Sequence, residues 1–72
     1  PDVFATVDAE GLSINGERIP DPDVGRVMVE ALLQSGATSA LLVPREGATA
    51  QNLVSALEMM RAGGRLKVVL AR

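Results

Sequence analysis

The chain has 72 residues, 47% of them hydrophobic, a net charge of −2, and neither cysteine nor histidine. This composition suits one small aliphatic core and excludes a disordered chain, and the lack of cysteine excludes disulfides and thiolate metal sites. A single aromatic residue, Phe4, and the acidic balance argue against a nucleic-acid binder, and no run of about 18 apolar residues is present to span a membrane.

The first part of the chain predicts strands and a hairpin. Residues 3–7 (VFATV) are rich in β-forming side chains, and residues 12–14 alternate between apolar and polar ones. The Asn-Gly pair at 15–16 is a strong hairpin signal because both residues tolerate positive φ. Its return arm, residues 17–19, stops at a proline, so we expect a brief edge or an extended lead-in rather than a full strand.

A first helix is predicted to begin at Asp21, a suitable N-cap, and to stop at Gly36. Its apolar stripe at helical spacing consists of Val24, Val27, Met28, Ala31, Leu32 and Ser35. Val29 and Leu33 fall outside this stripe, one turn apart. They belong either to an unusually wide apolar face or to a contact patch for another chain.

A strand, a capped helix and a second strand are predicted over residues 40–70. The apolar run at 39–43 suits a central strand, and Thr49 is a suitable cap for the helix that follows. The buried stripe of this helix is expected to contain Leu53, Val54, Leu57 and Met60. Met59 projects away from that stripe and is a candidate exposed residue. Two glycines at 63–64 end the helix.

The last strand is expected over residues 66–70. Lys67 and Val69 would share one of its faces, and the ordinary core residues Leu66, Val68 and Leu70 the other. The element order ββαβαβ then predicts one α+β domain over residues 1–72. Its architecture is a two-layer sandwich, with a four-stranded mixed sheet and two helices on one face.

The second face of this sheet would carry no helix. Val69 and two of the residues at 40–43 must nevertheless point to it. Because contiguous exposed apolar patches usually mark contact sites, we expect self-association or a partner chain.

Catalytic chemistry has little support in this sequence. Without histidine or cysteine, the serines have no base to activate them, so we expect neither an enzyme nor a cofactor. The close carboxylates Asp21 and Asp23 are explained by helix capping rather than by metal binding. Residues 45–47 precede a helix N-terminus that could hold an anion, but they lack the glycine spacing of a phosphate loop.

Residues 41–72, LLVPREGATAQNLVSALEMMRAGGRLKVVLAR, resemble the end of the periplasmic domain in the ExbD/TolR family of biopolymer-transport proteins. The helix of that family has the form V-x-x-A-L-x-x-x-x-x-A-G, and its positions are filled here by Leu53, Ala56, Leu57 and Met60. Upstream, GLSINGE at 11–17 is similar to the early hairpin of the family. The chain departs from the family at Pro44-Arg45 and Ala48-Thr49, where an acidic residue and Pro-Tyr are usual.

The resemblance implies a non-enzymatic periplasmic domain of a bacterial inner-membrane protein, part of a motor driven by the proton-motive force. The implied partners are a second copy in a homodimer, a proton-channel protein of the ExbB/TolQ type, and either a transducer of the TonB/TolA type or peptidoglycan. The proton-carrying aspartate of the family lies in a membrane helix ahead of this domain and matches no residue here. Because the chain begins with Pro1, we interpret it as a piece of a longer, membrane-anchored protein.

We expect the final strand to be the pairing element and the loop from Pro44 to Thr49 to be its rim. The candidate contact residues are Leu66, Lys67, Val68, Val69, Leu70, Pro44, Arg45, Val29, Leu33 and Met59. Two alternatives stay open at this point. One is a ferredoxin-like regulatory domain that binds small ligands in a polar-lined interfacial pocket, and the other is an accessory subunit of an enzyme whose chemistry lies on another chain.

Overall fold

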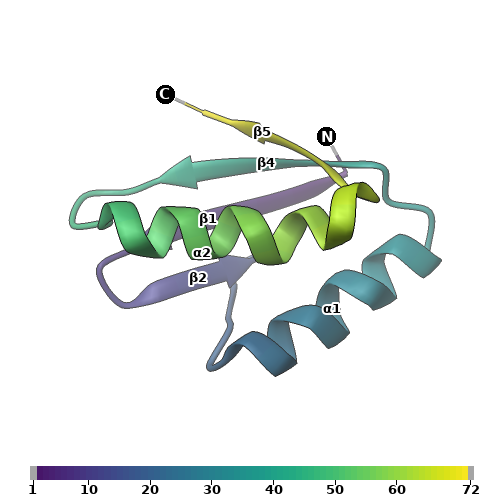
Figure 1. Ribbon diagram of the computed structural model, residues 1–72, viewed down its shortest axis with the longest axis horizontal. Coiled ribbons are helices and arrows are strands. Elements are labelled where there is room, and N and C mark those ends of the chain that lie inside the picture. Colours follow the sequence, from purple (N-terminus) through teal and green to yellow (C-terminus); the bar gives the residue numbers. More distant parts are fainter. Residues whose placement is uncertain (1, 72) are drawn as a thin grey trace.

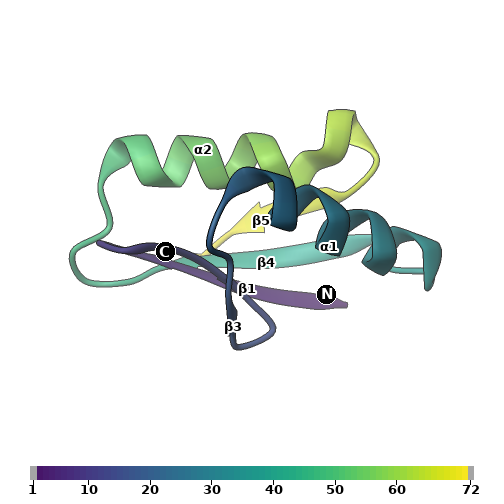
Figure 2. The same ribbon diagram turned by 90° about the horizontal axis from the view of Figure 1, so that it is seen from below.

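The computed structural model describes residues 2–71, which form a mixed sheet with two helices packed on one of its faces (Figures 1 and 2). The helices are α1 (Pro22–Gln34) and α2 (Ala50–Arg61), and α2 is followed by a tight turn, Ala62–Gly64. The strands are β1 (Val3–Asp8), β2 (Gly11–Ile14), β3 (Glu17–Arg18), β4 (Ser39–Pro44) and β5 (Lys67–Leu70).

The strand order across the sheet is β3-β2-β1-β4-β5. The pairs β1–β2 and β2–β3 are antiparallel, whereas β1–β4 and β4–β5 are parallel. The predicted α+β class, the mixed sheet and the two helices on one face are therefore confirmed. The parallel pairing of β4 and β5 follows from their connection through α2, because a helix returns the chain to the same end of the sheet.

The prediction of four strands is wrong, because the sheet has five. Asn15 and Gly16 adopt φ values of 51° and 85°, which make a tight two-residue hairpin and lay the return arm beside β2. The arm pairs over only Glu17 and Arg18. The next residue, Ile19, turns its side chain into the core.

Both helices begin at the predicted caps. The Asp21 carboxylate accepts a hydrogen bond from the Val24 N–H at 3.0 Å, and the Thr49 hydroxyl accepts one from the Asn52 N–H at 3.0 Å. These side chains satisfy N–H groups that the first turn of a helix leaves without a partner. The carboxylates at 21 and 23 thus have local structural partners, since Asp23 pairs with Arg26.

The core lies between the helices and the covered face of the sheet. Strand alternation directs one set of side chains from each central strand toward the helices. The buried core residues are Val3, Ala5, Val7, Leu12, Ile14, Ile19, Val29, Ala40, Leu42, Ala56, Met60 and Leu66.

The buried face of α1 is rotated relative to the predicted stripe. Val29, predicted to lie outside the stripe, is only 1% exposed, whereas Val27, predicted to be buried, is 71% exposed. The cause is Gly25, which lies one turn before Val29 and lets α2 approach closely. A Cβ atom built on Gly25 would lie 2.1 Å from the Met59 sulfur. Because glycine has no side chain, the spacing of apolar residues in the sequence does not reveal that Gly25 lies on the buried face of α1.

Three further predictions about the helices are wrong. Met59 is not exposed but packs against α1 at Gly25, and Leu33 is partly buried against the core rather than free as a contact patch. Val54, predicted to be core, is half exposed. Ala56 takes its place in the buried stripe of α2, together with Leu53, Leu57 and Met60.

Candidate protein-interaction surface

An apolar row crosses the face of the sheet that carries no helix. The strand register aligns Phe4 of β1 with Leu41 of β4, and Leu41 with Val69 of β5. Phe4 is 49% exposed and Val69 is 44% exposed, while Leu41 between them is partly buried. We call these three residues the open-face row. It arises because the alternate residues of the same strands are used in the core.

The β2–β3 half of this face is polar, whereas β4 adds one more apolar residue, Val43, which is aligned with Thr6. Thr6 is aligned with Ser13, and Ser13 with Arg18, so hydroxyls and a guanidinium occupy the β2–β3 half. Arg18 donates from both terminal nitrogens to the carboxylate of Asp8, each at 3.1 Å. Hydrogen bonding from Arg18 lowers the pKa of Asp8 below its ordinary value. The open face is therefore divided into an apolar half and a polar, charge-paired half.

The outer edge of β5 is free within the described residues. The Lys67 N–H donates to the Thr38 carbonyl at 3.1 Å and the Ala71 N–H donates to the Leu42 carbonyl at 2.9 Å, so these residues turn their backbone toward β4. Backbone direction alternates along a strand, so the N–H and C=O groups of Val68 and Leu70 point away from the sheet. This edge can accept another strand.

The side chains on β5 divide into an anchor and an exposed set. Leu66, just before the strand, is 1% exposed and belongs to the core, and Val68 is partly buried against it. Leu70 was predicted to be core but is 42% exposed, because its position at the edge of the sheet extends beyond the cover given by α2. Lys67 and Val69 share the open face, as predicted.

The structure does not bring all the predicted contact residues together. Pro44 ends β4, and Arg45 follows it with its N–H bonded to the Val7 carbonyl at 2.7 Å and its side chain exposed. They lie at the end of the sheet toward which β5 runs, which is compatible with a rim. Val29, Leu33 and Met59 belong to the helix layer and do not contribute to the open face.

Sequence reasoning missed Phe4 as a surface residue. The signal was present in the strand itself, because the alternation of residues 3–7 places Phe4 opposite to the core residues Val3, Ala5 and Val7. The partner residue Leu41 was left unspecified within the apolar run at 40–43. Its face became clear only from the register with β1.

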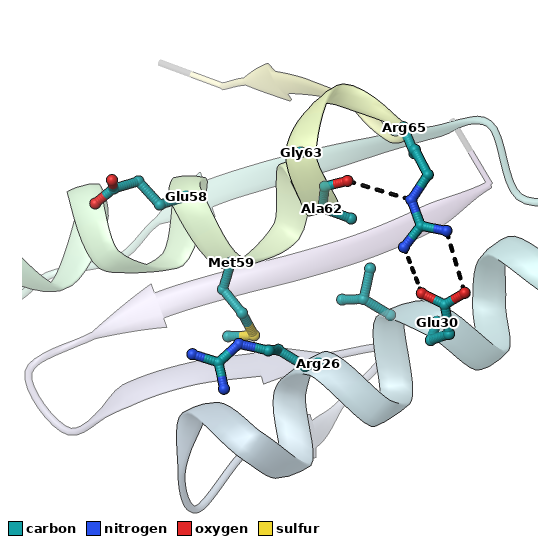
Figure 3. Close-up of a pocket in the computed structure, with 8 residues that line it drawn as sticks. Arg26, Glu30, Glu58, Met59, Ala62, Gly63 and Arg65 are labelled. Carbon is teal, nitrogen blue, oxygen red and sulfur yellow. Dashed lines mark hydrogen bonds and ion pairs between the residues drawn. The ribbon is translucent and has the colours of Figure 1, made fainter.

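A groove of about 310 Å³ lies between α1, α2 and the turn that follows α2 (Figure 3). Arg65 and Glu30 form a two-pronged ion pair on one side, and Arg26 on the other side is paired with Asp23. Hydrogen bonding from Arg65 lowers the pKa of Glu30. Both guanidinium groups therefore already have carboxylate partners, and Glu58 adds a further acidic side chain to the lining of the groove.

Within residues 2–71, no group of three or more acidic side chains gathers in a way that could hold a metal ion, and no buried side-chain polar atom lacks a hydrogen-bond partner. None of the helices in this range combines the length and apolar character needed to cross a membrane. Comparisons of the chain with protein-family models, with curated proteins and with solved structures found no match.

Proposed function

We propose that this domain is a non-enzymatic protein-interaction module that self-associates through the free edge of β5. The observation that carries the proposal is the juxtaposition of two features on one strand. Val68 and Leu70 direct unpaired backbone groups outward, and Val69 extends the open-face row to the same edge. Strand addition at such an edge obtains affinity from backbone hydrogen bonds and specificity from the side chains that flank them.

A two-fold, antiparallel pairing centred on Val69 fits this edge. It would set Val68 opposite Leu70 of the second copy, so that their outward N–H and C=O groups exchange hydrogen bonds. Lys67 would lie opposite Ala71 of the second copy, and therefore no like charges would face each other. The two open-face rows would join through Val69 into one apolar band across both sheets.

At the level of the whole protein, we propose that the module is the periplasmic domain of an ExbD/TolR-like subunit of a motor driven by the proton-motive force. The support is the resemblance of residues 41–72 and 11–17, taken with an element order in which a hairpin precedes an αβαβ unit. The full-length protein would be anchored in the bacterial inner membrane beside a channel protein of the ExbB/TolQ type. The dimer would contact a TonB/TolA-type transducer or peptidoglycan.

No specific observation favours a second function. A ferredoxin-like regulatory domain has the order βαββαβ, whereas this chain has its three antiparallel-paired strands before the first helix. Both arginines of the inter-helix groove are already held by carboxylates, Arg65 by Glu30 and Arg26 by Asp23, so neither supports a site for an anionic metabolite.

Sedimentation equilibrium of the 72-residue chain tests self-association. Four-residue strand pairing forms a small interface, so we expect reversible dimers with a dissociation constant on the order of micromolar to millimolar. Val69→Glu should weaken the dimer at least about tenfold, because it places two carboxylates opposite each other at the centre of the pairing. Val27→Glu is the matched control, since Val27 is the more exposed valine and lies on α1.

Two results would contradict the self-association proposal: a monomer at every concentration up to about 1 mM, or equal effects of the two glutamate variants. The family-level proposal has a separate test in the sequence upstream of Pro1. One apolar helix of about 20 residues carrying an aspartate supports it, and a soluble domain in that place contradicts it.

A further inference from the structure

The chain enters β5 through the turn Ala62–Gly64, which we call the hinge segment. Ala62, Gly63 and Gly64 have φ values of 50°, 70° and 97°, three consecutive left-handed conformations at the end of α2. Glycine adopts such values at little cost, but Ala62 does so under strain. β5 has a single neighbouring strand, so its release would require only the loss of its pairing with β4 and of its side-chain contacts.

Arg65 connects this hinge to α1 (Figure 3). Its two terminal nitrogens donate to the two carboxylate oxygens of Glu30. The same residue returns to the hinge, because its Nε and its backbone N–H both donate to the Ala62 carbonyl, at 3.3 and 3.4 Å. One side chain therefore holds the strained residue and attaches it to the neighbouring helix.

Both residues of this ion pair are positioned to restrain β5. Glu30 follows Val29, which is buried in the core, so the carboxylate is carried by a fixed part of the molecule. Arg65 precedes Leu66, the buried anchor of β5. Arg26 lies one turn from Glu30 on α1, but its ion pair is with Asp23, which leaves Arg65 as the partner of Glu30.

We propose that the Glu30–Arg65 ion pair is a clasp on the Ala62–Gly64 hinge that sets how often β5 detaches from β4. While the clasp is closed, β5 keeps its register and presents a fixed edge. When the clasp opens, the glycine-containing hinge lets the strand leave. The importance of this opening for assembly rests on the proposed function, in which β5 is the pairing strand, but the opening itself does not.

Residue-resolved amide hydrogen exchange of the 72-residue chain, at a concentration where it is monomeric, measures the opening. The amides of Lys67 and Ala71 report on β5, because they donate to the carbonyls of Thr38, just before β4, and of Leu42 in β4. The Arg45 amide donates to the Val7 carbonyl and reports on the β1–β4 pairing. Glu30→Gln should accelerate exchange at Lys67 and Ala71 about two- to fivefold, as expected for loss of an exposed ion pair, and leave Arg45 unchanged.

Asp23→Asn is the matched control, since it breaks an exposed ion pair of α1 that does not touch β5. This variant should leave the exchange rates of the Lys67 and Ala71 amides unchanged. The combined variant Glu30→Arg with Arg65→Glu reverses the ion pair but loses the Nε donor to the Ala62 carbonyl, so it should restore slow exchange only in part, whereas Glu30→Arg alone should not restore it.

Unchanged exchange at Lys67 and Ala71 in Glu30→Gln would overturn the clasp. Equal acceleration at the Arg45 amide would also overturn it, because the ion pair would then stabilise the whole domain rather than β5. These outcomes are independent of self-association. A domain that never dimerises can still possess the clasp. If the domain dimerises but exchange is unaltered in Glu30→Gln, the clasp proposal is rejected and the self-association proposal stands.

Discussion

The two edges of the sheet, β3 and β5, have opposite properties. β3 has two residues, both charged and exposed, and its outward backbone groups come from Arg18, whose side chain is bound to Asp8. β5 is twice as long and aliphatic at Val68, Val69 and Leu70. Short, charged edges resist the addition of further strands, and longer apolar ones permit it. The difference supports our proposal that β5, rather than β3, is the pairing edge.

Of the side chains in and just before β5, Leu66 should contribute most to holding the strand on the domain. Leu66→Ala removes a fully buried side chain and is expected to lower the free energy of unfolding by about 2–5 kcal/mol. Leu70→Ala, four residues later on the exposed edge, should cost less than about 1 kcal/mol. Urea denaturation of both variants is the measurement. Similar losses would contradict the division of β5 into an anchor and a free edge.

The stability of the β3 side of the molecule should depend on the close contact between the two helices at Gly25. Gly25→Ala places a Cβ atom 2.1 Å from the Met59 sulfur and 3.2 Å from Ile19, the residue that follows β3. We expect a loss of about 1–3 kcal/mol in unfolding free energy, moderated by movement of the flexible Met59 side chain. In a Met59→Ala background the same change should cost less. A cost that is the same in both backgrounds would exclude this contact as its cause.

The domain should become more stable when the strain at Ala62, in the hinge before β5, is removed. Ala62→Gly keeps the left-handed conformation without the steric cost of a Cβ atom and is expected to raise the unfolding free energy by about 0.5–1 kcal/mol. Ala56→Gly, inside α2 and buried, should lower it instead. Thermal unfolding of the two variants gives the comparison, and a loss of stability in Ala62→Gly would show that the alanine is not strained.

An arginine–carboxylate pair stands near each edge, Arg18 with Asp8 at β3 and Arg65 with Glu30 before β5, and both pairs should weaken in acid. The pKa values of Asp8 and Glu30 are lowered in the folded state by hydrogen bonds from Arg18 and Arg65. Their stabilising effect is complete above the ordinary carboxyl pKa values, 3.8 and 4.5, and is lost as the pH falls through the lowered values. Because both groups are exposed, we expect a small effect.

Urea titrations between pH 6 and pH 2.5 measure this dependence (the range brackets ordinary carboxyl titration, about pH 4). Asp8→Asn combined with Glu30→Gln should flatten the acid decline in unfolding free energy. An unaltered decline in the double variant would assign it to other carboxylates, of which Asp2 is one, because hydrogen bonds from Thr38 lower its pKa.

Local signals in the sequence predicted the elements well. The caps at Asp21 and Thr49 and the hairpin at Asn15-Gly16 depend on hydrogen bonds and φ values within a few residues, so their effect can be deduced without the fold. The rotation of α1 could not be deduced in this way. It depends on a contact between Gly25 and Met59, which are 34 positions apart and of which one has no side chain.

The candidate surface was predictable only in part for a similar reason. Alternation within the last strand correctly put Lys67 and Val69 on one face. The exposure of Leu70 depends on how far α2 extends over the sheet edge, and the alignment of Phe4 with Leu41 depends on a register between distant segments. Neither is encoded in a local pattern.

The concentration dependence of amide exchange at the two edges tests the central claim most directly. Val68 and Leu70 have outward N–H groups on β5, and Arg18 has one on β3, since the flanking Ile19 N–H donates to the Leu12 carbonyl. If the domain pairs through β5, raising its concentration should slow exchange at Val68 and Leu70 while Arg18 stays fast. Exchange at Val68 and Leu70 that does not change with concentration, or slowing at Arg18 instead, would contradict the account.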